Sequence, residues 1–192
     1  GKITIGETGY IATNNRIKID EGSKEEYTKA VFNSLLPEAN LKSSEVKNID
    51  NLDETLKTVL EVYQEGYAEV VGDAIYLNPM LGLNMEENPF KPEIRNYPID
   101  FRYSNTETVR LMFNIPAGYE FEEAPKNIAI TLPNKGITFK YSASINGTIL
   151  MISTKIDIST HLYSYTDYDY IKSLLQEVIA KQGEMIVLKK KA

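Results

Sequence analysis

The sequence has no cysteine and a single histidine, His161, among its 192 residues. The lack of cysteine excludes disulfides, thiol nucleophiles and cysteine metal sites. It does not fix the compartment, because proteins of the cytosol and of the periplasm can both lack cysteine. No run of about 18 apolar residues occurs, so we expect no membrane-spanning segment. The chain begins Gly1-Lys2-Ile3, without methionine or a signal peptide, and we therefore expect a piece of a longer protein.

Acidic residues outnumber basic ones. The chain has 21 Lys and Arg against 27 Asp and Glu, which gives a net charge of −6. This balance disfavours nucleic acid as a partner, because affinity for nucleic acid comes mainly from cations that meet phosphates. Hydrophobic residues make up 42% and charged residues 25% of the chain, a composition typical of a folded globular protein.

The first 80 residues predict a β-rich half with one helix. Residues 2–20 alternate loosely between apolar and polar, which indicates one bent strand or two short ones with a glycine bulge. Ser23 and Glu26 form a capping-box pattern, so a helix is expected over about 23–36, ending before Pro37. Two strands are expected within residues 41–63, joined by a polar turn.

A proline-rich segment separates this half from the next. Four of the eight prolines of the chain fall between Gly72 and Asp100: Pro79, Pro89, Pro92 and Pro98. Each proline lacks an N–H group and fixes its φ angle, so the segment cannot continue as a strand. We interpret residues 81–97 as an ordered crossover belt between two β-rich halves.

Residues 98–192 predict a β-sandwich-like half. Alternation is clear over residues 108–115, and Asn146-Gly147 favours a two-residue type I′ hairpin turn. A helix is expected over about 167–182, with a cap at Thr166, a stop at Gly183 and an apolar stripe that includes Leu174. A last strand is expected at 184–190. The fold class predicted for the whole chain is thus α+β, mostly antiparallel β, with a β-α-β-β half and a β-sandwich-like half that ends in a helix and a final strand.

Few residues suggest chemistry. His161 lies between a strand and a loop without a serine motif nearby, so we interpret it as a surface histidine. Asp50, Asp53 and Glu54 bring several oxygens to one turn, but their spacing fits no calcium loop, and a solvated turn is favoured. We predict no metal site, no cofactor and no catalytic residue in this chain.

Four tyrosines crowd one short segment, namely Tyr163, Tyr165, Tyr168 and Tyr170. Exposed tyrosines could stack on sugars or hold a partner, because they offer apolar area and a hydroxyl group. Alternatively, they pack the start of the helix onto a sheet, which is the favoured interpretation overall and for Tyr170 in particular. Tyr163 and Tyr165 are the best candidates for an exposed binding site.

Several short motifs carry a family resemblance. They are Asp73–Pro79, Asn88–Lys91 with Arg95, Tyr97-Pro98, Asp100, Ile115–Tyr119, Ala124-Pro125, Tyr170 and Ile186–Lys189. Together they resemble the C-terminal domain of unknown function that follows a transglutaminase-like core in large bacterial envelope proteins. Upstream, Gly9–Ala12 with Arg16 resembles the strand that leaves the core in such proteins.

This resemblance implies a non-catalytic accessory domain in the periplasm or cell envelope, whose partner is the upstream transglutaminase-like (papain-like) core of the same chain. The presumed catalytic residues of the family lie in that core, so this chain is not expected to be an enzyme. The alternative is a β-sandwich module that binds a cell-wall peptide or glycan through Tyr163 and Tyr165. An independent enzyme is the third hypothesis, and it would need two carboxyl groups that converge in a cleft.

Overall fold

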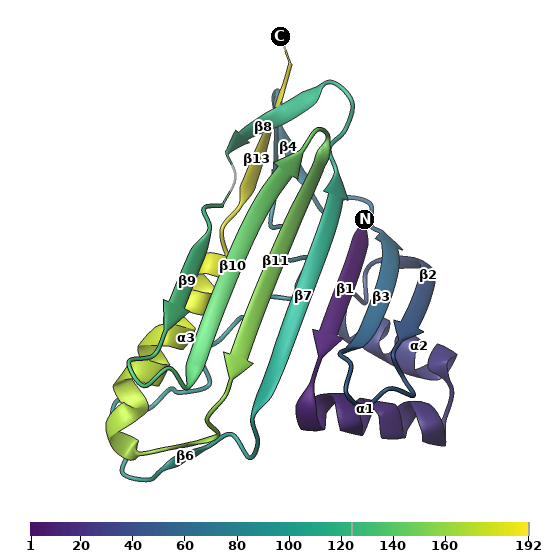
Figure 1. Ribbon diagram of the computed structural model, residues 1–192. Helices are drawn as coiled ribbons and strands as arrows, with labels where there is room; N and C mark the ends of the chain where they lie inside the picture. The colour runs from purple at the N-terminus through teal and green to yellow at the C-terminus, as the bar shows by residue number, and fades with distance from the viewer. Residues whose placement is uncertain (124, 192) are drawn as a thin grey trace.

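The computed structural model describes residues 1–123 and 125–191, so Ala124 of the Ala124-Pro125 motif lies outside the described residues. Strands account for 41% and helices for 23% of the chain, and the sheets are mostly antiparallel (Figure 1). A C-terminal helix is followed by a final strand, as predicted, which confirms the α+β fold class. No helix among the described residues is both long and apolar enough to cross a membrane.

The largest unit is a seven-stranded antiparallel sheet with the order β2-β3-β1-β7-β11-β10-β9. The N-terminal strands join the later ones where β1 pairs with β7, over six residue pairs from Lys2 with Met112 to Glu7 with Glu107. Residues far apart in sequence therefore form one continuous sheet. Its strands are β1 (Lys2–Glu7), β2 (Asn40–Lys47), β3 (Leu56–Tyr63), β7 (Asn105–Asn114), β9 (Ile128–Thr131), β10 (Ile137–Asn146) and β11 (Ile149–Ile158).

Two smaller sheets complete the β structure. One has four strands in the order β4-β5-β13-β8, so the final strand β13 returns to a sheet between two earlier strands. The other pairs β12 with β6. Their bounds are β4 (Glu69–Val71), β5 (Ala74–Leu77), β6 (Ile99–Asp100), β8 (Tyr119–Glu123), β12 (Leu162–Tyr163) and β13 (Ile186–Lys190).

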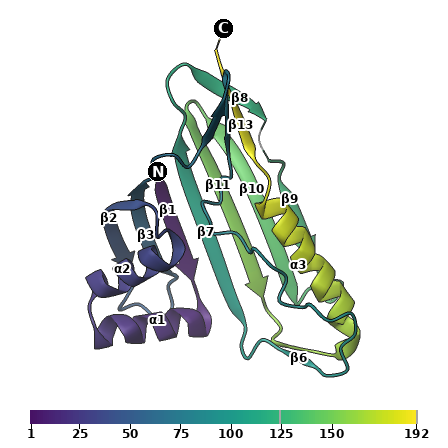
Figure 2. The ribbon, with the colours of Figure 1, turned by 180° about the vertical axis from the view of Figure 1, so that it is seen from behind.

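The helices cover one face of the large sheet and leave the other face open, as the two opposite views show (Figures 1 and 2). They are α1 (Gly9–Glu21), α2 (Lys24–Leu35) and α3 (Tyr168–Gln182), the last preceded by a 3₁₀ turn, η1 (Tyr165–Asp167). Buried apolar side chains of one register row point to the covered face. They are Ile3, Leu60, Leu111 and Ile152.

The strand expected across residues 9–20 is instead helix α1. Its buried positions are Ala12, Arg16 and Ile19, which recur at helical spacing, but an arginine holds the middle of that stripe. The buried Arg16 guanidinium donates hydrogen bonds of 2.8–3.0 Å to four backbone carbonyls of the β2–β3 turn: Asn48, Ile49, Asn51 and Glu54. The carbonyls of the polar turn thus bind a buried guanidinium group. Because an arginine is usually exposed, Arg16 interrupts the apolar pattern by which the helix could have been predicted.

Local predictions at the chain reversals are confirmed in part. Ser23 caps α2 by accepting from the Glu26 N–H, as expected. The β10–β11 hairpin also forms, but its two-residue loop is Gly147-Thr148, because Asn146 pairs with Ile149 and only Gly147 has positive φ. The prediction of a type I′ turn at Asn146-Gly147 is therefore wrong by one residue.

The ends of α3 also differ from the prediction. Ser164, and not Thr166, provides the capping hydroxyl, and it accepts from the Thr166 N–H at the start of η1. Gly183 has φ −80° and is not a left-handed stop. The stripe expected on α3 is confirmed, because Leu174 is buried with its helical neighbours.

The proline-rich segment is fixed against α3 by polar contacts. The Asn88 side-chain amide donates to the Lys172 carbonyl (2.8 Å), and the Met85 N–H donates to the buried Gln182 side chain (2.8 Å). The Tyr168 hydroxyl donates to the Pro92 carbonyl at 2.6 Å. These bonds satisfy backbone groups of a segment that has no sheet partners of its own.

Candidate functional site

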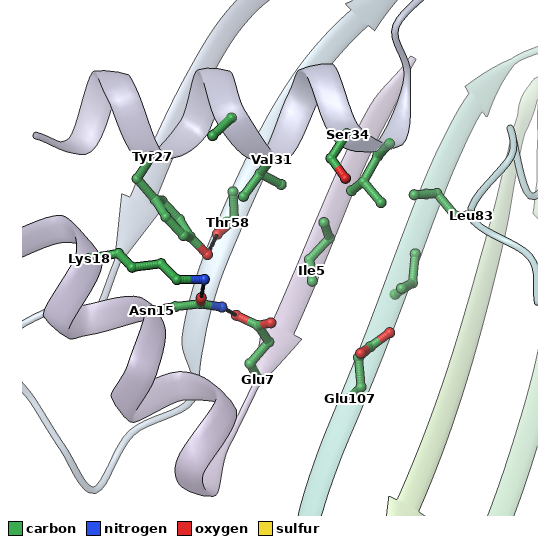
Figure 3. Close-up of a pocket in the computed structure, with 13 residues that line it drawn as sticks. Ile5, Glu7, Asn15, Lys18, Tyr27, Val31, Ser34, Thr58, Leu83 and Glu107 are labelled. Carbon is green, nitrogen blue, oxygen red and sulfur yellow. Dashed lines mark hydrogen bonds between the residues drawn. The ribbon is translucent and has the colours of Figure 1, made fainter. Parts of the chain in front are cut away.

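A cavity of about 360 Å³ lies on the covered face of the large sheet, between the sheet and the helices α1 and α2 (Figure 3). We call it the carboxylate pocket, because Glu7 and Glu107 both line it. Apolar side chains of β1, β7 and α2 form much of the wall, together with Leu83 from the proline-rich segment. It combines an apolar wall with a few polar groups, which is the usual character of a small-molecule site.

The two carboxylates meet because β1 pairs with β7. Glu7 and Glu107 are directly opposite in the ladder, so both side chains project from the same face. Opposed residues in antiparallel strands have Cβ atoms about 4.5–5.5 Å apart. In the same register row, Leu56 of β3 flanks Glu7 and Ile156 of β11 flanks Glu107. The sheet itself therefore supplies no cation to this pair.

Side chains of α1 provide partial compensation. The Asn15 amide donates to the Glu7 carboxylate at 2.9 Å, and the Lys18 ammonium donates to the Asn15 side-chain oxygen at 3.3 Å (Figure 3). Lys18 thus acts on Glu7 through Asn15 and does not form a salt bridge with it among the described contacts. The Tyr27 and Thr58 hydroxyls lie 3.4 Å apart deeper in the same pocket.

The environment makes both carboxyls weaker acids. Burial raises the pKa of Glu7, and the hydrogen bond from Asn15 and the charge of Lys18 oppose this effect. Glu107 is exposed, but partial desolvation by the surrounding protein raises its pKa, and the neighbouring charge of Glu7 raises it further. The pair therefore holds protons more tightly than free glutamates would.

The paired carboxyls suit this pocket to acid–base exchange or to the binding of a cationic group. Neither histidine nor cysteine lines it. Across the residues that the structure describes, no group of three or more metal-ligating side chains is suited to hold an ion.

Sequence reasoning missed the carboxylate pocket. Two converging carboxyls were expected only under the hypothesis of an independent enzyme, and no pair was named for it, because Glu7 and Glu107 are 100 positions apart and meet through strand pairing. A signal was present, since each glutamate continues the apolar face of its strand: Glu7 follows Ile3 and Ile5, and Glu107 precedes Val109 and Leu111. A charged residue at an inward position of a strand suggests a functional site. Only the pairing of β1 with β7 shows that the two glutamates belong to the same site.

The structure separates the two predicted tyrosine site residues. Tyr163 is only 2% exposed and packs edge-on against Phe101, with ring centroids 5.9 Å apart, so its expected exposure is wrong. Its hydroxyl fills the space beside Gly136, where a Cβ atom would lie 2.3 Å away. Tyr165 is 53% exposed and remains a candidate contact residue.

The other residues of this segment are also distributed differently from the prediction. Tyr170, expected to pack, is exposed, and Tyr168 is buried in its place. Phe90 contacts Tyr168 edge-on at 5.6 Å and ties it to the proline-rich segment. His161 is exposed, as expected for a surface histidine.

Comparison with known families places most of these elements in one domain. Residues 73–188 match the model of a domain of unknown function with a solved structure, DUF3858. The chain belongs to the DUF3858 family. The match begins just before β5 and ends within β13, so the DUF3858 region contains the proline-rich segment, β7 and α3.

No curated protein matches the sequence. Among solved structures, the chain is similar to one described as a "putative protease from Parabacteroides distasonis", with 12% identity and a TM-score of 0.45. The similarity covers 52% of this chain and 19% of that one, so it concerns a small part of a much longer protein.

The carboxylate pocket lies at the junction between the DUF3858 region and the residues before it. Leu83, Glu107 and Val109 come from the DUF3858 region, whereas Glu7 and the helical walls come from residues upstream of it. The pocket is therefore formed only where the two segments pair.

Proposed function

We propose that this chain is a non-catalytic accessory domain of a bacterial envelope protein, and that it braces a transglutaminase-like core that precedes it. The observation that carries the proposal is the β1–β7 ladder, in which the segment upstream of the DUF3858 region is bonded to it over six residue pairs. A domain that receives an upstream strand into its main sheet is well suited to hold what precedes it in a fixed orientation.

The motifs that carry the family resemblance support a structural role. Asn78 and Asn88 donate side-chain hydrogen bonds to carbonyls of α3. Arg95 donates to the carbonyls of Tyr97 and Pro98. These residues are engaged in internal contacts that shape the proline-rich segment. The location in the periplasm or cell envelope belongs to the same proposal and rests on the resemblance.

The alternative, a glycan- or peptide-binding module at the tyrosine segment, has weaker support. It requires Tyr163 and Tyr165 on one surface, and Tyr163 is buried. Tyr165 alone offers a single exposed ring, which is a small anchor for a sugar or peptide.

A binding titration tests the proposal. The upstream core of the parent protein is produced separately and added to this chain, and the mixture is followed by size-exclusion chromatography and by thermal denaturation. We expect saturable co-elution and mutual stabilisation, since a ligand that binds only the folded state raises its melting temperature. The variant Tyr165→Ala serves as a control and should bind the core equally well. Separate elution with unchanged melting temperatures would contradict the brace.

A further inference from the structure

The open face of the seven-stranded sheet carries a concentration of positive charge. The strand registers place one row of four lysines across it, with Thr108 and Gly6 between the two pairs: Lys140, Lys155, Lys57 and Lys47. Arg110 lies in the adjacent row and Lys2 in the row after it. We call these six residues the basic face; it is the side of the sheet turned toward the viewer in Figure 1.

Part of this charge is compensated within the chain. Lys47 pairs with Glu45 (3.1 Å), and Lys155 pairs with Asp157 (3.6 Å). Glu61 lies opposite Lys2, and its carboxylate accepts a hydrogen bond from Ser43 at 3.1 Å.

The remaining cations of the basic face lack such partners. Arg110, Lys57 and Lys140 form no salt bridge among the described residues. Three acids thus accompany six cations on this face, whereas the chain as a whole carries an excess of six acids. The basic face therefore carries a net positive charge on a chain whose net charge is negative, and it attracts anions locally.

A hollow of about 360 Å³ is centred on this face beside Arg110. Lys2 and Arg110 line it together with four serine and threonine side chains, Met112 and Met151. Leu111 and Ile152 complete the lining, which contains neither a carboxylate nor an aromatic ring. The hollow thus offers cations and hydroxyl donors beside two flexible apolar side chains, and methionine surfaces of this kind adapt to varied aliphatic partners.

We propose that the basic face docks an extended, glutamate- or aspartate-rich polypeptide segment of a partner protein. The carboxylates would meet Arg110 and the unpaired lysines, while aliphatic side chains would contact Met112 and Met151. Charge complementarity selects this occupant and gives it orientation. The hollow has no ring on which a sugar could stack, and the acidic remainder of the chain repels long phosphate polymers. The proposal goes beyond the brace and does not depend on the identity of the upstream core.

Methionine-methyl NMR provides a direct test on the whole chain. The protein is labelled at its five methionine methyl groups and titrated with a synthetic glutamate-rich peptide that contains interspersed leucines. We expect saturable shifts of the Met112 and Met151 methyl signals, whereas Met80, which is fully buried elsewhere, stays unchanged. The same peptide with glutamine in place of glutamate should cause no saturable shift. Binding should also weaken as salt is raised from about 0.05 M to about 0.5 M.

Charge variants complete the test. Arg110→Gln and Lys140→Gln should each raise the Kd about three- to fivefold, the range expected for one exposed ion pair. Lys29→Gln, at an exposed position of α2 on the helical side, is the matched control and should leave the Kd unchanged. All three proteins should keep the wild-type melting temperature, which separates lost binding from lost folding. The proposal is overturned if the methionine signals do not move, if the glutamine peptide binds equally, or if a sulfated glycan shifts them while the acidic peptide does not.

Discussion

The two faces of the seven-stranded sheet handle charge in opposite ways. On the covered face, Glu7 and Glu107 lie side by side, flanked by apolar residues, and both have raised pKa values. On the open face, six cations lie among hydroxyl groups and methionines, and four of them have no salt bridge among the described residues. Charge on the covered face thus affects stability, because Glu7 is buried and lies beside the like charge of Glu107, whereas charge on the open face is available for association.

Adjacent residues of β7 provide the strongest contrast between the faces. Leu111 is 2% exposed on the covered face, and Met112 is 39% exposed on the open face. We expect Leu111→Asp to lower the free energy of unfolding by roughly 4 kcal/mol, because it buries an unpaired charge in the core. Met112→Asp should cost less than about 1 kcal/mol. Urea denaturation of both variants measures the difference, and equal losses would show that the open face is covered.

The buried cation of the helical side should produce the next largest effect. Arg16→Ala removes four hydrogen bonds to carbonyls of the β2–β3 turn, and we expect a loss of about 2–4 kcal/mol. Arg16→Lys should recover only part of it, since an ammonium group cannot reproduce the planar fork of donors. Hydrogen exchange should then show increased opening of residues 48–55. A loss below about 0.5 kcal/mol would mean that water replaces the guanidinium at no cost.

The carboxylate pair should make stability depend on pH. A carboxyl whose pKa is higher in the folded state than in the unfolded state favours folding when protonated, so stability falls as the pH rises through that range. Because the pKa values of Glu7 and Glu107 are both raised, we expect this loss as the pH increases from about 4.5 toward neutrality.

The variant Glu107→Gln tests this sign. It removes one charge of the pair, so it should stabilise the protein at pH 7 and lose that advantage near pH 4. Glu93→Gln, at an exposed position in the proline-rich segment with no salt bridge among the described residues, is the control for a general effect of charge. Denaturant midpoints measured across this pH range decide the outcome, and a stability gain that is equal at both pH values would contradict the pair.

The smallest expected effect on stability comes from the open face. Arg110→Gln should change the free energy of unfolding by less than about 0.5 kcal/mol, because Arg110 is exposed and has no salt bridge within the described residues. Denaturation in parallel with the wild type measures this change. A larger loss would assign Arg110 to the support of the sheet and weaken its role in docking.

The longer strands could be predicted from the sequence, because β3, β7, β10 and β11 display their buried faces through alternation. The short or exposed strands β2, β4 and β5 show no such pattern. Helix α1 could not be predicted, since Arg16 occupies a buried position that usually reads as exposed. The burial of Tyr163 could not be predicted either. Its hydroxyl fills the space beside Gly136, a residue distant in the sequence, and no local pattern indicates that contact. The carboxylate pocket and the basic face both depend on the register of β1 with β7, and no local pattern specifies the pairing of strands that are 100 residues apart.

If this DUF3858 protein braces an upstream core, as we propose, the melting temperature of that core must depend on its presence. It is measured in the parent protein with this chain present and with this chain removed, using a signal confined to the core. We expect the core to melt several degrees higher when the chain is present, through a contact that size-exclusion chromatography also detects. Equal melting temperatures in the two proteins, with no detectable contact, would contradict it.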